Sequence, residues 1–332
     1  MTMTYPAVIA HVYSSVDSYT TATATPRLKP FRASPFLGTL TVTVGRAPRW
    51  LFRATRRLYA LDILRGGNFT GWLEGGLDPD FRLHRGELSR PWYTTFVLEV
   101  PPVRVDPAAW DTAMVHEATL HEAAVLLAAN ASANVIEKRE LRGLFLQRGD
   151  GKWVKCPQFE MGTPSVAIGH SEGALRGDLL AAQATFRSLP AVRPATMRID
   201  WALKALLSEE PWAQFVWFMF SLEQLTDEHF RAKHPTRDQL VLAGAEAYVR
   251  AAVPNASIRW SRPSITMQFA AVAAHLSPGT GAADTATFHS LLETRNRLLH
   301  GTQSEAPDGV TRQVARELAL RYNKLVACDP IP

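Results

Sequence analysis

The sequence has little cysteine and no long hydrophobic run, and each absence excludes a class of protein. Cys156 and Cys328, its two cysteines, lie too far apart for a metal-binding spacing such as CxxC and provide no disulfide framework. This scarcity fits a reducing cytoplasm. The longest apolar run, residues 215–220, is far shorter than the roughly 20 residues that a membrane-spanning helix needs. The first ten residues lack the basic segment of a secretion signal. We therefore expect a cytoplasmic protein outside the membrane.

What the sequence does contain is sufficient for packed cores. Its 332 residues are 46% hydrophobic and 20% charged, which predicts about two globular domains. Basic residues outnumber acidic ones by 36 to 31, and this mild excess permits a nucleic-acid partner without requiring one. One arginine-rich stretch is opposed only by Asp62, and we interpret it as a solvated strand in preference to an anion-binding patch. Its members are Arg46, Arg49, Arg53, Arg56, Arg57 and Arg65.

The first part of the chain, residues 1–190, reads as a mixed domain rich in strands. Residues 39–44 alternate β-branched and apolar side chains, and residues 51–64 and 92–105 also have an extended pattern. The pair Asp106-Pro107 is typical of a helix start, and the alanine-rich segment to residue 131 predicts one long helix. Further on, the pair Asp150-Gly151 predicts the turn of a hairpin.

The second part reads as helical throughout. Residues 188–196 contain two prolines and no periodic pattern, so we place a linker there. Beyond the linker, residues 197–328 have the three-and-four periodicity of an all-α bundle. The fold class expected for the chain is therefore α+β, with a β-rich domain followed by a helical one. The predicted helices are 200–207, 212–229, 237–252, 264–275, 284–300 and 310–326.

The segment with the clearest chemical pattern is the helix predicted over residues 284–300. It contains Arg295, Asn296 and His300 in the order RNxxxH. Arg295 falls on the apolar stripe of this helix, where a guanidinium is costly unless an anionic or hydrogen-bonding group meets it. Gly301 follows as the residue expected just past a helix end, so His300 lies in the last turn.

This helix resembles the HEPN superfamily, whose ribonuclease members carry an RNxxxH motif near the end of a helical bundle. The flanking residues extend the resemblance, and a helix with Trp217, Phe218 and Glu223 resembles the first long helix of such bundles. The match spans roughly residues 197–328 and looks closest to the Apea-like branch. It implies a homodimer whose two motifs meet in one cleft. The flanking residues that match are Phe288, Leu291, Leu292, Glu293 and Gly301.

The residue types in the motif suit RNA cleavage without a metal or another cofactor. The RNA 2′-hydroxyl attacks the adjacent phosphorus and leaves a 2′,3′-cyclic phosphate. His300 titrates in the useful range as general acid or base, Arg295 has a planar fork for phosphate, and Asn296 can orient either. Residues 295 and 300 are about 140° apart around a helix, so a single helix presents them imperfectly to one phosphate. As supporting residues we name Glu223, Glu293 and His289.

The sequence favours one function and leaves two alternatives open. The preferred function is a metal-independent endoribonuclease acting on RNA, tRNA included, with a regulatory protein partner and a sensor domain in residues 1–190. The resemblance implies a prokaryotic defence or toxin effector. The first alternative is a non-catalytic HEPN interaction module. The second is a serine hydrolase using Ser171 in a GxSxG motif, although the later chain supplies helices where that fold needs strands.

A second histidine pattern, on the helix predicted to begin at Asp106, argues against a metal site. His116, Glu117 and His121 depart from the HExxH spacing of zinc proteases, because the two histidines are five positions apart instead of four and therefore point about 140° apart around the helix. We interpret these residues as exposed polar positions of an amphipathic helix.

Overall fold

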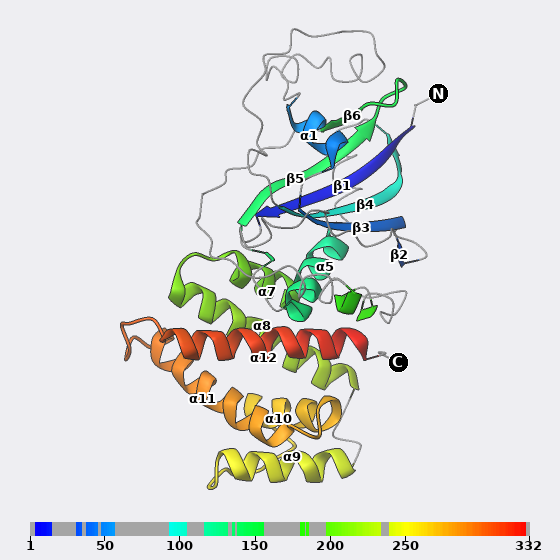
Figure 1. Ribbon diagram of the computed structural model, residues 1–332. Helices are drawn as coiled ribbons and strands as arrows, with labels where there is room; N and C mark the ends of the chain where they lie inside the picture. The colour runs from blue at the N-terminus through cyan, green and yellow to red at the C-terminus, as the bar shows by residue number, and fades with distance from the viewer. Residues whose placement is uncertain are drawn as a thin grey trace. The chain divides into compact units, whose positions relative to one another are not determined.

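The computed structural model separates the chain into two compact units, and each is described by itself. Unit 1 comprises residues 1–187 and 191–193, and unit 2 comprises residues 188–190 and 194–332. The first contains a sheet and the second a set of helices, so the fold class is α+β (Figure 1). Within the described part of the chain, no helix is both long and apolar enough to cross a membrane. The residues that the structure describes are 4–14, 31–34, 38–45, 48–56, 93–104, 116–131, 135–136, 138–155, 180–182, 184–185, 197–233 and 239–329.

Unit 1 is built on a six-stranded antiparallel sheet in the order β2-β3-β4-β1-β5-β6. The strand β1 lies inside the sheet, where Ile9 faces Leu98 of β4 on one side and Leu144 of β5 on the other. All three of these side chains are fully buried. The strands are β1 (Thr4–Ser14), β2 (Phe31–Ser34), β3 (Gly38–Gly45), β4 (Tyr93–Arg104), β5 (Lys138–Gln147) and β6 (Trp153–Lys155).

Two of the predicted strands and the predicted hairpin are confirmed. The alternation over residues 39–44 becomes β3, with Leu40, Val42 and Val44 buried on one face. The run over residues 92–105 becomes β4. Strands β5 and β6 form the predicted hairpin around Gly151, whose φ of +77° lies in the left-handed region that favours glycine.

One segment expected to be extended is a helix. Residues 51–64 were predicted as a strand with solvated arginines, whereas α1 (Arg49–Arg56) is helical. Leu51 and Ala54, three residues apart, lie on one helix face and are buried, and Trp50 packs on Trp153 and Phe145 beside them. That spacing suits a helix, so burial of this face overrides the mixed pattern. The rest of the arginine-rich stretch lies outside the described residues.

The helix α5 (Glu117–Asn130) packs against β4 in unit 1. It falls within the predicted helix over residues 106–131, and the predicted start at Asp106 lies outside the described residues. Its apolar residues from Ala123 to Ala128 are all buried. The GxSxG motif around Ser171 also lies outside the described residues.

Unit 2 is helical throughout its described residues, and all six predicted helices are confirmed. The helix α8 is central to the group and packs against four others, namely α7, α10, α11 and α12. Phe288 of α11 stacks on Phe269 of α10 with ring centroids 4.2 Å apart. The helices are α7 (Met197–Leu207), α8 (Pro211–Lys233), α9 (Gln239–Ala252), α10 (Ile265–Leu276), α11 (Gly281–Leu299) and α12 (Gly309–Cys328).

A buried polar chain fixes the relative positions of α7, α8 and α12. The Ser221 hydroxyl of α8 donates to the Arg198 carbonyl of α7 at 2.7 Å. The Asn323 amide of α12 donates to the same hydroxyl oxygen at 2.9 Å. Because a buried polar group is costly when unpaired, these bonds favour a single arrangement of the three helices. They hold α8, the helix that carries Glu223.

Candidate functional site

The predicted site lies on α11, which buries one face and leaves its C-terminal end accessible. Phe288 and Leu291 are buried against the bundle. Near the start of the helix, Asp284 accepts a hydrogen bond from Tyr322 of α12 at 2.9 Å and pairs with Arg321. These contacts anchor the first half of α11 to α12. The second half carries the residues of the RNxxxH motif.

The C-terminal end of α11 has the backbone geometry that the sequence predicts. Gly301 has a φ of +69°, and its N–H donates to the Leu298 carbonyl at 3.2 Å. The Thr302 N–H donates to the Arg297 carbonyl at 3.0 Å, which completes a Schellman motif. His300 is therefore the C-cap residue, and its side chain is exposed.

Arg295 meets its anionic partner within the same chain. Its Nη2 donates to Oε2 of Glu223 on α8, and its Nη1 donates to Oδ1 of Asn296 at 2.7 Å. The guanidinium carbon lies 5.6 Å from the centre of the Phe220 ring, which adds a cation–π contact. The sequence predicted that Arg295 needs an anionic or hydrogen-bonding partner, and Glu223 of the same chain is such a partner.

The Arg295–Glu223 pair is half-buried and incompletely hydrogen-bonded. The two side chains are 19% and 21% exposed. Within the described residues, Nε of Arg295 and Oε1 of Glu223 are buried without a hydrogen-bond partner. Burial raises the pKa of Glu223, and the neighbouring Arg295 offsets this only in part. The ionised carboxylate is therefore under-compensated, and the pair retains capacity for a further polar ligand.

The other predicted residues lie apart from this pair. His300 forms no side-chain hydrogen bond or ion pair within the described part of the chain, so it is not joined to Arg295 or Asn296. His289 Nδ1 lies 3.4 Å from the Thr266 hydroxyl of α10, and its Nε2 lies 3.6 Å from Oε1 of Glu293. The structure thus unites Arg295, Asn296 and Glu223 by contact, and it leaves His289 with Glu293 as a separate pair.

A polar surface hollow borders the same end of α11. Thr294 and Arg297 of α11 line one side, Thr311 of α12 lines another, and residues 302–308 close it. The Arg297 guanidinium donates to the Thr294 hydroxyl at 3.1 Å. A second cation therefore stands within one turn of His300. Sequence reasoning missed this hollow because its lining includes the loop between two helices, whose path no periodic pattern predicts.

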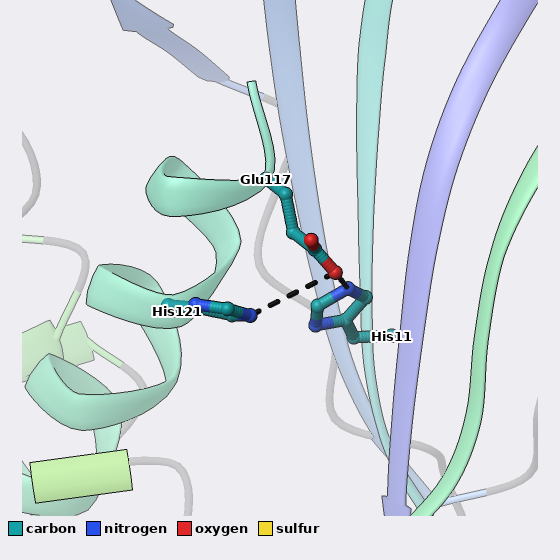
Figure 2. Close-up of side chains that lie close together, drawn as sticks. All are labelled: His11, Glu117 and His121. Atoms are coloured by element: carbon teal, nitrogen blue, oxygen red, sulfur yellow. Dashed lines mark hydrogen bonds and ion pairs between the residues drawn. The ribbon is translucent and has the colours of Figure 1, made fainter. Parts of the chain in front are cut away.

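A second polar cluster lies in unit 1, and it corrects the interpretation of Glu117 as exposed. Figure 2 shows His11 of β1 directed at Glu117 of α5, with His121 beside them. His11 Nε2 lies 2.7 Å from Oε1 of Glu117, and His121 Nε2 lies 3.7 Å from the same oxygen. Arg142 of β5 donates to both carboxylate oxygens. Glu117 is only 3% exposed, because the start of α5 packs on the sheet where His11 and Arg142 lie.

The titration of this cluster follows from its burial and its donors. Burial lowers the pKa of His11 to about 4, which keeps the imidazole neutral at physiological pH. Burial raises the pKa of Glu117, but hydrogen bonds from His11, His121 and Arg142 outweigh that effect and hold this pKa far below its usual range. His11 was missed in the sequence because it lies 106 residues before its carboxylate partner. With both carboxylate oxygens engaged by Arg142, the cluster is suited to holding α5 on the sheet.

Comparison with known proteins adds no family name. No family model matches the chain, no curated protein matches it, and no solved structure matches it. The resemblance to HEPN ribonucleases therefore rests on the residues of α8 and α11 themselves.

Proposed function

We propose that unit 2 is a HEPN-type, metal-independent endoribonuclease whose active unit is a homodimer. The observation that carries the proposal is the arrangement on α11: Arg295 held by Glu223 and hydrogen-bonded to Asn296, with exposed His300 at the end of the same helix. An arginine positioned by an acid near an accessible histidine is what phosphodiester cleavage through the 2′-hydroxyl needs.

In the proposed reaction one phosphorus–oxygen bond forms, another breaks, and two protons are transferred. The 2′-oxygen of RNA forms a bond to the adjacent phosphorus as its proton leaves to a base, and the bond from phosphorus to the 5′-oxygen breaks as that oxygen gains a proton. The products are a 2′,3′-cyclic phosphate and a free 5′-hydroxyl. His300 serves in these proton transfers, and Arg295 stabilises the charge that grows on the phosphate oxygens. A second His300, from the other copy, supplies the second proton-transfer group.

Because the Arg295–Glu223 pair is under-compensated, a phosphate could replace the Glu223 carboxylate as the partner of Arg295. A phosphate that reaches the guanidinium competes with a carboxylate whose ionised form is disfavoured by burial. Arg297, beside the neighbouring hollow, adds positive charge for the nucleic-acid backbone. RNA, tRNA included, is the proposed substrate. A defence or toxin role with a regulatory protein partner and a sensor in unit 1 belongs to the same proposal.

The test is a cleavage assay with purified full-length protein, single-stranded RNA and tRNA in excess chelator. Wild type is compared with His300→Ala and with the control Ser171→Ala. We expect cutting by wild type and Ser171→Ala, loss of cutting in His300→Ala, and products that end in a cyclic phosphate. The absence of cutting by wild type under any activating condition would contradict the proposal. Loss of activity in Ser171→Ala alone would favour the serine hydrolase.

A non-catalytic interaction module is the second candidate, and the exposed apolar side chains beside the motif favour it. Leu299, just before His300, is 49% exposed, and Val310 at the start of α12 is 75% exposed. Exposed leucine and valine at such positions suit a protein partner. Under this alternative, His300→Ala leaves partner binding intact, whereas Leu299→Ser weakens it.

A further inference from the structure

Three helix ends in unit 2 bring two histidines and one aspartate together. His229 lies near the end of α8, His275 in the last turn of α10, and Asp329 is the C-cap of α12. Nε2 of His229 lies 3.0 Å from Oδ2 of Asp329, and Nε2 of His275 lies 3.4 Å from the same oxygen. One ligand atom from each side chain therefore converges on a common point, with all three within 4.8 Å of one another.

The fold holds these three side chains and leaves one side accessible. The His229 side chain is 1% exposed. The backbone N–H of Asp329 is shared between the Leu325 and Val326 carbonyls at 3.1 and 3.2 Å, which fixes the residue that bears the carboxylate. The His275 side chain is 38% exposed. A small ion from solvent therefore has a path to the cluster past His275.

The surroundings of the cluster favour a cation. Each residue lies at the C-terminal end of its helix, where the backbone carbonyls carry about half a negative charge. The ends of α8 and α12 lie on the same side of the bundle, as their contact through His229 and Asp329 requires (Figure 1). The carboxylate of Asp329, next to the C-terminal ends of α8, α10 and α12, makes the local potential more negative. A divalent cation would neutralise this potential.

We propose that His229, His275 and Asp329 form a binding site for a divalent transition metal, with Zn²⁺ as the preferred ion. Two imidazole nitrogens and one carboxylate oxygen are a usual zinc ligand set. In a tetrahedral site with bonds of about 2.0–2.2 Å, ligand atoms lie roughly 3.3–3.5 Å apart, close to the two separations to Asp329. Each imidazole binds the metal through an unprotonated Nε2, so a proton on that atom moves to Nδ1 or is released to solvent as the metal binds. Its fourth position, on the exposed side, is left for water.

The His11–Glu117–His121 cluster has the same ligand types, and its surroundings explain why we do not assign a metal there. Arg142 donates to both oxygens of Glu117, so a metal would have to displace a guanidinium and then sit beside its positive charge. His11 is also fully buried. The two clusters thus provide a matched pair for an experiment, one expected to bind metal and one not.

The metal site is independent of the proposed ribonuclease site. His229 lies six residues beyond Glu223 on α8, about 9 Å along the helix axis and on a different face. The metal would join the ends of α8, α10 and α12 without taking part in RNA cleavage. Metal binding is therefore measured without RNA, and failure of either proposal leaves the other standing.

The experiment uses the full chain without a polyhistidine tag, stripped with a chelator that is then removed. Zn²⁺ is titrated by calorimetry, and Co²⁺ is titrated by visible absorption, which reports tetrahedral coordination. Wild type and the control His121→Ala should bind one equivalent. Binding to His275→Ala should be more than about 100-fold weaker, because loss of a supporting partner alone costs 10–100-fold. Saturating Zn²⁺ should also raise the Tm of wild type and not that of His275→Ala.

Asp329→Asn provides a second variant, since it removes the charge and keeps the shape of the side chain. It should also lose Zn²⁺ binding, and circular dichroism checks that both variants keep the helical content of wild type. The proposal is overturned if wild type binds no metal, or if His275→Ala and Asp329→Asn bind it as wild type does. Loss of binding in His121→Ala alone overturns it too, because the metal would then lie in unit 1.

Discussion

Glu117 in unit 1 and Glu223 in unit 2 are both carboxylates paired with an arginine from a distant part of the chain, yet their pKa values shift in opposite directions. The Glu117 side chain is 4% exposed, and its pKa is far below the usual range. The Glu223 side chain is 21% exposed, and its pKa is raised. The more deeply buried carboxylate is thus the more stable anion. The number of donors decides the direction, because His11, His121 and Arg142 all serve Glu117, whereas Arg295 alone serves Glu223.

The two pairs differ in how completely they are hydrogen-bonded. We call Glu117 with Arg142 the closed pair and Glu223 with Arg295 the half-open pair. In unit 1 both carboxylate oxygens are bonded, so the cluster has little to gain from a ligand. In unit 2 one oxygen of Glu223 and Nε of Arg295 have no hydrogen-bond partner within the described residues. A buried pair with unpaired atoms costs free energy that a polar ligand can recover. This contrast is why we propose an anion-binding site on α11 and none on α5.

The largest expected effect comes from opening the closed pair. Glu117→Gln removes a buried carboxylate charge that His11 and the partly buried Arg142 both contact, and it should lower the free energy of unfolding of unit 1 by about 3–5 kcal/mol. Urea unfolding measures the change, and hydrogen exchange of β1 and α11 peptides assigns it to unit 1. Glu293→Gln, at a 61% exposed side chain, is the control and should change stability by less than about 1 kcal/mol. Equal effects of the two variants would contradict the comparison.

The next effect is a pH dependence that belongs to His11. The imidazole has an ordinary pKa of 6.5 in the unfolded chain and a pKa of about 4 when folded. Between these values the unfolded chain binds a proton that the folded chain does not, so stability falls as pH is lowered, by up to about 3 kcal/mol in total. Glu117, with an ordinary pKa of 4.5 when unfolded and a pKa far below that when folded, adds to the loss only as the pH approaches 4.5, so the upper part of the range belongs to His11.

Urea unfolding of wild type and His11→Gln between pH 6.5 and 4.5 measures this term. The variant is less stable at every pH, and its stability should fall less steeply with acid than that of wild type. If the unfolding free energies of the two proteins fell equally steeply with acid, His11 would have an ordinary pKa in the folded chain. The Glu117 cluster would then be less isolated from solvent than its burial indicates.

A smaller effect is expected at the helix end that presents His300. Gly301→Ala forces a residue with a β-carbon into the left-handed region and should cost about 1 kcal/mol. The space around Gly301 is open, with no atom within 4 Å of an added β-carbon, so only the backbone contributes. Gly151→Ala in the hairpin of unit 1 has the same open surroundings and should cost the same. Thermal unfolding compares them, and a much larger loss at Gly301 would reveal a further contact.

The smallest effect should come from the half-open pair. A raised pKa means that the folded chain stabilises the ionised form of Glu223, relative to the neutral form, less well than the unfolded chain does. Glu223→Gln, which mimics the neutral form, should therefore change the free energy of unfolding by less than about 1 kcal/mol, in contrast to Glu117→Gln. Urea unfolding again gives the value. A loss as large as that of Glu117→Gln would mean that Arg295 compensates its carboxylate fully.

Local pattern was sufficient to predict the helices of unit 2 and the hairpin of unit 1. Three-and-four spacing marks all six helices, and the pair Asp150-Gly151 marks the turn. Local pattern wrongly predicted a strand where α1 lies. Arginines alternate with a few apolar residues there, and the helical spacing of the buried residues becomes clear only from their packing near Trp153. Strand β1 was missed although it lies inside the sheet, since its pairing partners are far along the chain.

The polar clusters were predictable only in part, for the same reason. Arg295 on an apolar stripe signalled a need for an anion, and Glu223 on an aromatic helix was a natural candidate, although 72 residues separate them. No spacing rule connects His229 with Asp329, 100 residues later, because their meeting depends on where three helices end. A site whose side chains lie on one helix can be predicted from sequence spacing, whereas a site formed by side chains from several helices cannot.

The place of β1 inside its sheet also sets an order for biosynthesis. Thr4–Ser14 leaves the ribosome early, but its partners β4 and β5 end at Arg104 and Gln147. At roughly 5–20 residues per second, the wait for β5 is on the order of 10 s. Both edges of the apolar strand β1 are unpaired until β4 is made, and one edge stays unpaired until β5 is made; unpaired edges are where chains aggregate. The long separation of β1 from its partners therefore predicts that this sheet forms slowly and is open to aggregation while the chain is being made.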